Sequence, residues 1–171
     1  SQASINAAHD EEFLHLLRRS GCMGVLIGFE SLNPENLRAM NKTFNTMRGG
    51  YLKALDNLRK HRIRLYGTFI FGYDHDTPED FRETVAFARE QGFYIAAFNH
   101  LTPFPATPLY ERLQQQGRLR FERWWLDDGY SYNTIPFRPA QLEPEELQRL
   151  CVDARRQFYT WPSIFRRSVM G

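Results

Sequence analysis

The stretch at residues 23–31, Met23-Gly24-Val25-Leu26-Ile27-Gly28-Phe29-Glu30-Ser31, decides the fold class of this chain. Its first part is short, apolar and rich in branched side chains, without alternating polar residues, which is typical of a strand covered on both faces. Asn33 and Pro34 then supply the N-cap and the first residue of a helix. A strand that runs directly into a helix is the repeating unit of a parallel α/β sheet.

The same unit recurs along the chain. The sequence predicts further strands at residues 65–71 and 94–99, and the end of an earlier strand within residues 1–5. It predicts helices that begin at Asp10, after Gly49-Gly50, at the capping box Thr77-Pro78-Glu79-Asp80, at residue 108 and at residue 144. The expected buried faces are Phe13, Leu16 and Leu17; Tyr51, Leu55 and Leu58; Phe81, Val85 and Ala88; and Leu147, Leu150, Cys151, Ala154 and Phe158.

Either a doubly wound sheet or a barrel satisfies this alternation of strands and helices. Barrels place functional groups at the carboxyl ends of several consecutive strands. Ser4, Glu30, Asp74 and the pair Asn99-His100 all occupy such positions. We therefore favour a barrel segment. Within it, Glu30 and Lys42 set a carboxylate and an ammonium around one strand-to-helix turn.

Composition excludes several classes of protein. The chain has 171 residues and a net charge of only +2, which argues against nucleic acid as the main partner. No apolar run approaches the roughly 20 residues that cross a bilayer, and Ser1-Gln2-Ala3-Ser4 lacks the features of a secretory signal, so we expect a cytoplasmic protein without a membrane span. Cys22 and Cys151, the two cysteines, are too few for an iron–sulfur cluster or a disulfide framework.

Four motifs in series resemble the radical S-adenosylmethionine (radical SAM) enzymes, and in particular the branch that often carries an N-terminal cobalamin-binding domain. The motifs are Gly28-Phe29-Glu30-Ser31, Leu37-Arg38-Ala39-Met40-Asn41-Lys42, Thr68-Phe69-Ile70-Phe71-Gly72, and Thr102-Pro103-Phe104-Pro105-Ala106-Thr107-Pro108-Leu109-Tyr110. The resemblance covers about residues 1–118, and the ordered series is more specific than any single motif.

The resemblance implies a partial (β/α)6 barrel in which three closely spaced cysteines hold a [4Fe-4S] cluster. No C-x3-C-x2-C motif occurs in this chain. The resemblance therefore implies the C-terminal half of the catalytic domain, with the cluster ligands, and possibly a cobalamin site, outside the chain. The implied partners are the upstream half of the same polypeptide and a small-molecule substrate. The implied chemistry is reductive cleavage of S-adenosylmethionine (SAM), possibly followed by cobalamin-dependent methyl transfer or rearrangement.

The resemblance also suggests roles for individual residues. Glu30 matches an acceptor for the ribose hydroxyls or the amino group of SAM, and Lys42 matches a basic partner of its carboxylate. Thr68 and Phe69 lie on the strand that runs along the adenine, and Ser4 and Ser31 complete the expected cofactor-binding set. An ordinary strand-end salt bridge and a plain core strand are the alternatives for these residues. His100 is a weak catalytic candidate, for which a structural role is favoured.

Residues 119–171 form the second expected unit, an aromatic and helical extension of the half-barrel. Its aromatic segment, which includes Trp124, Trp125, Tyr130 and Tyr132, fits either a substrate lid or a cover for a sheet edge, and we favour the cover. We expect no metal site in the chain, because consecutive loop residues such as Asp74-His75-Asp76 cannot all face one ion easily. Two other classes stay open: a non-catalytic domain for protein association, and a complete enzyme of another barrel family that would rely on Glu30 and His100.

Overall fold

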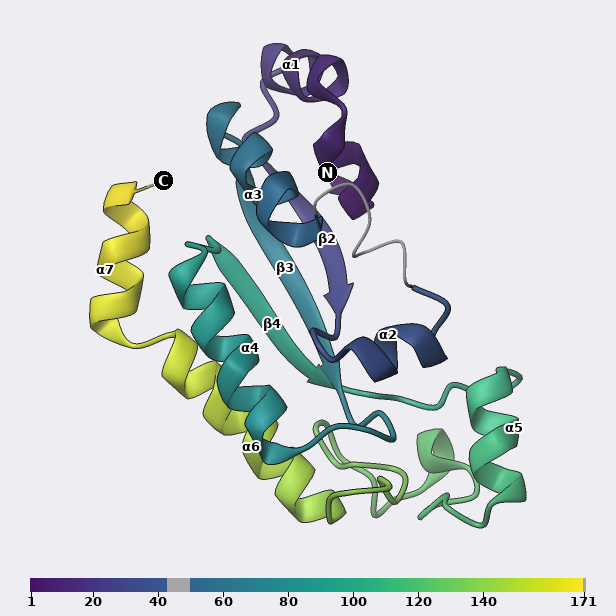
Figure 1. Cartoon of the computed structure of the whole chain (residues 1–171). Helices are drawn as coiled ribbons and strands as arrows, with labels where there is room; N and C mark the ends of the chain where they lie inside the picture. Colours follow the sequence, from purple (N-terminus) through teal and green to yellow (C-terminus); the bar gives the residue numbers. More distant parts are fainter. Residues whose placement is uncertain (43–49, 171) are drawn as a thin grey trace.

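The computed structural model describes residues 1–42 and 50–170, arranged around one parallel sheet (Figure 1). The four strands are β1 (Gln2–Ala3), β2 (Gly24–Glu30), β3 (Arg64–Phe71) and β4 (Ile95–His100). The α-helices are α1 (Glu11–Arg19), α2 (Pro34–Ala39), α3 (Gly50–Lys60), α4 (Pro78–Glu90), α5 (Pro108–Gln115), α6 (Pro144–Phe158) and α7 (Trp161–Met170), and short 3-10 helices span Ile5–His9 and Trp124–Leu126. Gly49, expected just before α3, lies outside the described residues.

The order of the strands decides between the two expected architectures. The sheet runs β1-β2-β3-β4, and each neighbouring pair is parallel. A doubly wound sheet reverses its strand order at a switch point, whereas a barrel adds each strand beside the one before it. The prediction of a barrel segment with parallel strands is confirmed. None of the helices in the described ranges is long and apolar enough to cross a membrane.

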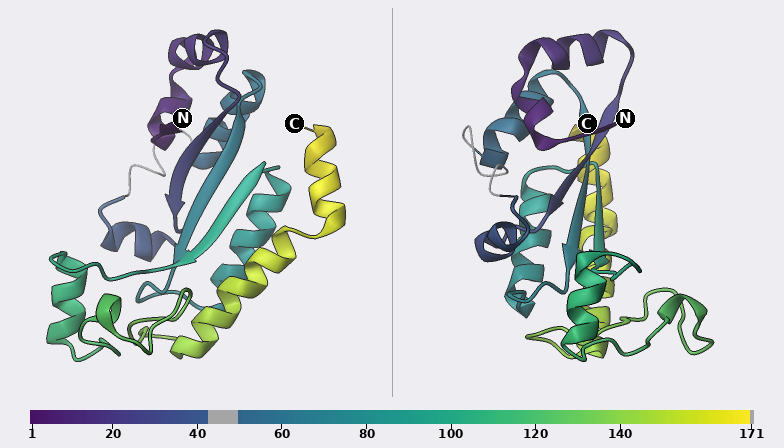
Figure 2. Two further views of the ribbon diagram at one scale, coloured as in Figure 1. Left: turned by 180° about the vertical axis from the view of Figure 1, so that it is seen from behind. Right: turned by 90° about the vertical axis from the view of Figure 1, so that its right-hand side faces the viewer.

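One face of the sheet is closed by helices and carries the core (Figure 2). Four phenylalanine rings are fully buried there: Phe29, Phe69, Phe93 and Phe98. The ring centroid of Phe93 lies 5.0 Å from that of Phe29 and 5.8 Å from that of Phe69, and the Phe69 and Phe98 centroids are 5.7 Å apart. Such aromatic contacts add to the stabilisation that comes from burying their area. The core is therefore dominated by rings from β2, β3 and β4 and by Phe93, which lies just before β4.

The other face of the sheet is only half-buried, which corrects the expectation of strands covered on both faces. Residues along β2 and β3 alternate between buried and half-buried positions. Met23 lies before β2 and is exposed, and Ile95 and Asn99 are exposed on β4. The open face is the side on which a barrel has its interior.

Helix α1 confirms its predicted start but not its predicted buried face. The Asp10 side chain accepts a hydrogen bond from the Phe13 N–H, as an N-cap does. The buried residue is Leu14, whereas Phe13 and Leu16 are exposed. The predicted starts of α4 and α5 are also confirmed, and a capping box joins Thr77 and Asp80 at α4.

Helix α6 covers the free edge of the sheet. Tyr159 follows α6 directly. Its hydroxyl accepts a hydrogen bond from the Ala96 N–H at 3.2 Å and donates one to the Ala96 carbonyl at 2.9 Å. Both backbone groups would otherwise stand unpaired on the edge strand. The aromatic segment expected to cover this edge lies elsewhere: Trp124 donates to the Pro103 carbonyl at 2.8 Å and packs against Phe104.

The extension shares the core of the half-barrel. Ile135, Phe137, Leu147 and Phe158 belong to the same hydrophobic cluster as the strand residues. Residues 118–120 also pair with residues 136–138 through backbone hydrogen bonds and an antiparallel bridge. Helix α7, which follows Tyr159, was not expected from the sequence.

Candidate functional site

The turn at the end of β2 places a carboxylate over the open face of the sheet. Glu30 has a positive φ of 64° and sits at a bulge, where Gly28 pairs with Thr68 but Glu30 pairs with Phe69. A Cβ atom on Gly28 would lie 2.6 Å from Glu30 Oε1, so only glycine leaves room for the carboxylate. The strained backbone of Glu30 and the missing side chain of Gly28 together fold the acid back over the strand.

Lys42 reaches this carboxylate because of the way in which α2 ends. Asn41 adopts a left-handed conformation (φ 55°), and its N–H donates to the Arg38 carbonyl. The Lys42 N–H donates to the Leu37 carbonyl at 2.8 Å, which completes a Schellman motif. The Lys42 ammonium then lies 2.7 Å from Glu30 Oε1. The other oxygen, Glu30 Oε2, makes no hydrogen bond within the described ranges, so it is available to a ligand.

A hollow of about 370 Å³ lies beside this pair at the carboxyl ends of β1 and β2. Residues from three separate parts of the chain line it: Gln2, Ala3, Ser4, Ile5, Gly28, Glu30 and Lys42. Three of the residues singled out in the sequence, Ser4, Glu30 and Lys42, are thus brought together. Thr68 is next to them, since its Oγ1 lies 3.7 Å from the position of a Cβ on Gly28.

Ser31 and Phe69, the remaining members of the expected set, have structural surroundings. The Ser31 Oγ accepts from the Asn33 N–H at 3.0 Å, so its hydroxyl shapes the turn into α2. Phe69 is fully buried in the aromatic core, on the helix side of the sheet. Because side chains alternate along a strand, its ring cannot also face the hollow, and we do not include it in the site.

His100 likewise points to the helix side of the sheet. It pairs in register with Phe71, and its Nδ1 lies 3.0 Å from the Leu101 carbonyl. Burial, reinforced by the charge of Arg155, lowers its pKa. The neighbouring residue, Asn99, is exposed on the open face instead. A catalytic pair of Glu30 and His100 is therefore ruled out by their opposite faces.

Two residues outside the predicted cofactor-binding set, Asp76 and Tyr73, lie next to the site. Asp76 is buried and accepts from the Gly72 N–H at 2.7 Å, the Tyr73 N–H at 2.9 Å and the Asn36 side chain at 2.6 Å. These bonds join the β3–α4 loop to α2 (Pro34–Ala39), the helix whose C-terminal turn leads to Lys42. Burial raises the pKa of Asp76 to about 6. Burial, together with the charges of Glu30 and Asp76, also raises the pKa of Tyr73, so its phenol stays protonated.

The structure gives no support for a metal site or cluster among the described residues. They include no group of three potential metal ligands. Asp74 is paired with Arg118 at 2.9 Å rather than turned toward Glu30. Cys22 precedes the amino end of β2, and Cys151 is buried in α6, where burial raises its pKa to about 12. These two cysteines do not fit a [4Fe-4S] cluster.

Comparison with known proteins identifies the family. The model of the radical SAM superfamily matches residues 2–88. The chain belongs to this superfamily. The matched region contains the three strands β1, β2 and β3, together with Ser4, Glu30, Lys42 and Thr68.

Individual relatives of this radical SAM chain agree with the assignment. It is 37% identical over 164 residues to a bacteriochlorophyllide d C-12(1)-methyltransferase of Chlorobaculum tepidum, covering 96% of this chain and 35% of the relative. A C-8(2)-methyltransferase of the same organism is 29% identical, with coverage of 97% and 36%. The chain thus spans about a third of the length of these relatives.

A solved structure supports the fold. The radical SAM methyltransferase TsrM from Kitasatospora setae, with cobalamin and a [4Fe-4S] cluster bound, matches with a TM-score of 0.56 and 26% identity. The match covers 87% of this chain and 29% of TsrM. The fold and the sequence family are therefore consistent with one another.

Proposed function

We propose that this chain forms one wall of a SAM site in a longer radical SAM enzyme, with the Glu30–Lys42 pair as its polar centre. The observation that carries the proposal is that both side chains line one hollow with Ser4 at the strand ends. SAM carries an ammonium and a sulfonium as well as a carboxylate. A site with one anion, one cation and nearby hydroxyls matches that distribution of charge.

The roles of the residues follow from their available atoms. Glu30 Oε2 accepts a hydrogen bond from the amino group or a ribose hydroxyl of the ligand, while Oε1 stays paired with Lys42. Lys42 has three N–H donors, so it can bind a carboxylate and keep its bond to Glu30. Ser4 and Thr68 offer further hydroxyls at the rim. SAM, when bound beside a reduced cluster, supplies the radical chemistry of the superfamily.

The reaction of the whole protein is proposed to be a methyl transfer to a small-molecule substrate in the cytoplasm, with cobalamin as a second cofactor. The names of the two relatives described above support this, since they are methyltransferases, and the TsrM structure holds cobalamin. The ligands of the cluster and of cobalamin would come from other parts of the polypeptide. A non-catalytic association domain has no support in these comparisons.

The test measures SAM affinity directly. The full-length protein is reconstituted anaerobically with iron and sulfide, and SAM binding is followed by equilibrium dialysis for the parent, Glu30→Gln and Lys42→Met. Losing a charge-assisted hydrogen bond costs about 1.5–3 kcal/mol, so we expect about tenfold or weaker binding for each variant. The matched controls are Glu111→Gln and Lys53→Met, which change exposed residues away from the hollow. Unchanged affinity in Glu30→Gln and Lys42→Met would reject the site.

A further inference from the structure

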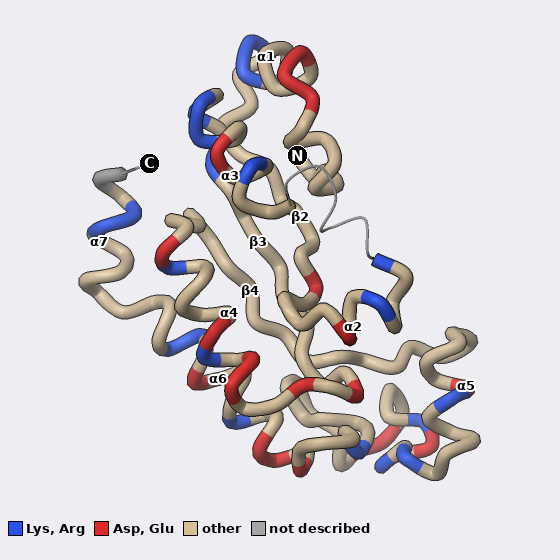
Figure 3. Tube along the Cα trace, in the orientation of Figure 1, with Lys and Arg blue, Asp and Glu red and all other residues tan. Residues whose placement is uncertain are grey.

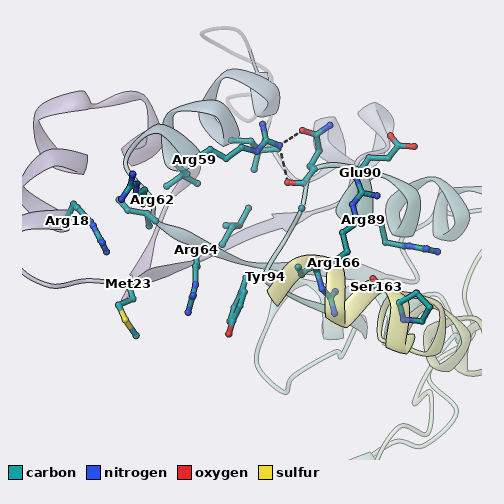
Figure 4. A pocket seen from close by; sticks show the side chains of 18 residues that line it. Arg18, Met23, Arg59, Arg62, Arg64, Arg89, Glu90, Tyr94, Ser163 and Arg166 are labelled. Carbon is teal, nitrogen blue, oxygen red and sulfur yellow. Dashed lines mark hydrogen bonds between the residues drawn. The ribbon is translucent and has the colours of Figure 1, made fainter. Parts of the chain in front are cut away.

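A second, larger hollow lies at the opposite end of the strands, where each strand begins. It has a volume of about 1090 Å³ and lies between the end of α1, the α3–β3 turn, the end of α4 and α7 (Figure 4). Figure 1 shows these segments at the amino end of the sheet, away from α2 and the Glu30 turn. We call it the arginine groove, because arginine dominates its lining. The proposed SAM site does not use it.

The charge of the arginine groove is one-sided. It is lined by Arg18, Arg59, Arg62, Arg64, Arg89, Arg166 and Arg167, with Glu90 as the one acidic residue among its lining residues. The whole chain has a net charge of only +2, so this end holds a local excess that composition hides (Figure 3). Arg18, Arg62, Arg89 and Arg166 are exposed and form no ion pair with another described residue. Unpaired like charges repel one another, so an external anion would stabilise the groove.

Three further arginines are fixed in place by their neighbours. Arg59 donates to the backbone and side chain of Gln91, at 3.0 and 2.6 Å, and Arg64 stacks on the Tyr94 ring at 4.6 Å. Arg167 is only 8% exposed and lies 3.9 Å over the Phe158 ring. Its Nε and Nη1 atoms have no hydrogen-bond partner in the described ranges. Leaving buried donors unpaired is costly, so an acceptor that reached these atoms would stabilise this end of the groove.

Large apolar side chains are exposed in the lining of the arginine groove and on α7, the helix that carries four of the lining residues. Met23 lines the groove and is 65% exposed. Trp161 and Phe165 lie one turn apart on α7, and are 83% and 73% exposed. The same helix turns Ser163 and Arg167 inward. A helix that exposes aromatic rings and buries polar groups is adapted to an apolar surrounding next to its charged groups.

We propose that this end of the protein docks on an anionic lipid bilayer, with headgroup phosphates in the arginine groove and Met23, Trp161 and Phe165 in the interfacial layer. Guanidinium groups bind phosphate oxygens through paired N–H donors. Tryptophan and basic residues together are the composition of surfaces that lie on membranes. A second copy of the chain would bring two positive grooves together, and a soluble phosphate does not account for the exposed methionine and phenylalanine.

The first test is sedimentation of the full-length protein with vesicles. Vesicles of phosphatidylcholine alone are compared with vesicles of equal parts phosphatidylcholine and phosphatidylglycerol. We expect binding to the mixed vesicles only. Binding should be lost at about 1 M salt, where the Debye length falls to about 3 Å.

Variants locate the binding surface. Each basic residue near an anionic membrane contributes about 1 kcal/mol, or about fivefold in affinity, so Arg18→Glu with Arg166→Glu should weaken binding by about 25-fold or more. Trp161→Ala with Phe165→Ala should also weaken it, with no change in net charge. The matched control, Arg123→Glu with Arg138→Glu, makes the same charge change at exposed positions outside the groove and should leave binding near the parent value.

Several results would overturn the proposal. These are equal binding to neutral vesicles, no sedimentation with either kind, or an equal loss in the Arg123 and Arg138 control. Binding of a single-stranded RNA oligonucleotide in preference to vesicles would assign the groove to nucleic acid. Displacement of bound protein from vesicles by millimolar inorganic phosphate would assign it to a soluble phosphate ligand.

Discussion

The sequence predicts the place of Glu30 at the end of a strand, but not the local backbone that brings its side chain to Lys42. Its place at the end of an apolar strand, ahead of an N-cap, indicated a functional carboxylate. Its contact with Lys42 depends on two local features, the positive φ at Glu30 and the Schellman motif at Asn41. Phe69 is predicted to line the cofactor site, but its ring lies in the aromatic core. Its strand is apolar on both faces, so the sequence does not tell which side chains face the helices.

Gly28 gives a prediction at the same scale. In Gly28→Ala the new methyl group would overlap Glu30 Oε1, and the flexible carboxylate would have to move away from Lys42. We expect SAM affinity to fall several-fold, while the free energy of unfolding changes by less than about 1 kcal/mol, because no backbone atom is displaced. Equilibrium dialysis and chemical denaturation of the full-length protein measure the two quantities. A large loss of stability with intact affinity would contradict this account of Gly28.

At the scale of elements, the sequence predicts correctly the helices whose capping residues and apolar pattern agree with the side that is buried. Helix α4 has a capping box and a regular apolar stripe, and both are present in the structure. Helix α1 has a clear N-cap, but its apolar residues are split between the core and solvent. Helix α7 was missed because it exposes Trp161 and Phe165 and buries Ser163 and Arg167, the reverse of the usual pattern.

The loop between β3 and α4 should make stability depend on pH. The pKa of Asp76 is raised to about 6 in the folded protein, from an ordinary value near 4. Between about pH 4 and pH 6, Asp76 therefore keeps its proton in the folded protein but has lost it in the unfolded chain. The contribution of Asp76 is therefore fully present below about pH 4 and falls by about 3 kcal/mol as pH rises through about 6.

Denaturant unfolding at a series of pH values checks this contribution. Asp76→Asn should lack the fall between about pH 4 and pH 6.5, whereas Asp128→Asn, at an exposed position, should keep the parent profile. If the free energy of unfolding changed with pH equally in the parent and in Asp76→Asn, the Asp76 carboxyl would not titrate as described. The expected difference lies in the slope, so an overall loss of stability in Asp76→Asn does not affect the conclusion.

At the scale of the whole molecule, the two ends of the sheet have different chemistry. The carboxyl ends of the strands hold a paired acid and base over a small hollow. The amino ends hold unpaired arginines beside exposed aromatic rings. The proposed SAM site would account for the first end. Composition could not reveal the second, because Glu90 is the one acidic residue, among those described, that lines the arginine groove.

A crystal structure of the anaerobic full-length protein with SAM tests the central claim most directly. The account predicts the ligand in the hollow beside Ser4, with polar atoms of SAM within hydrogen-bond distance of the Glu30 carboxylate and the Lys42 ammonium. SAM bound elsewhere, with Glu30 and Lys42 contacting only each other, would contradict it.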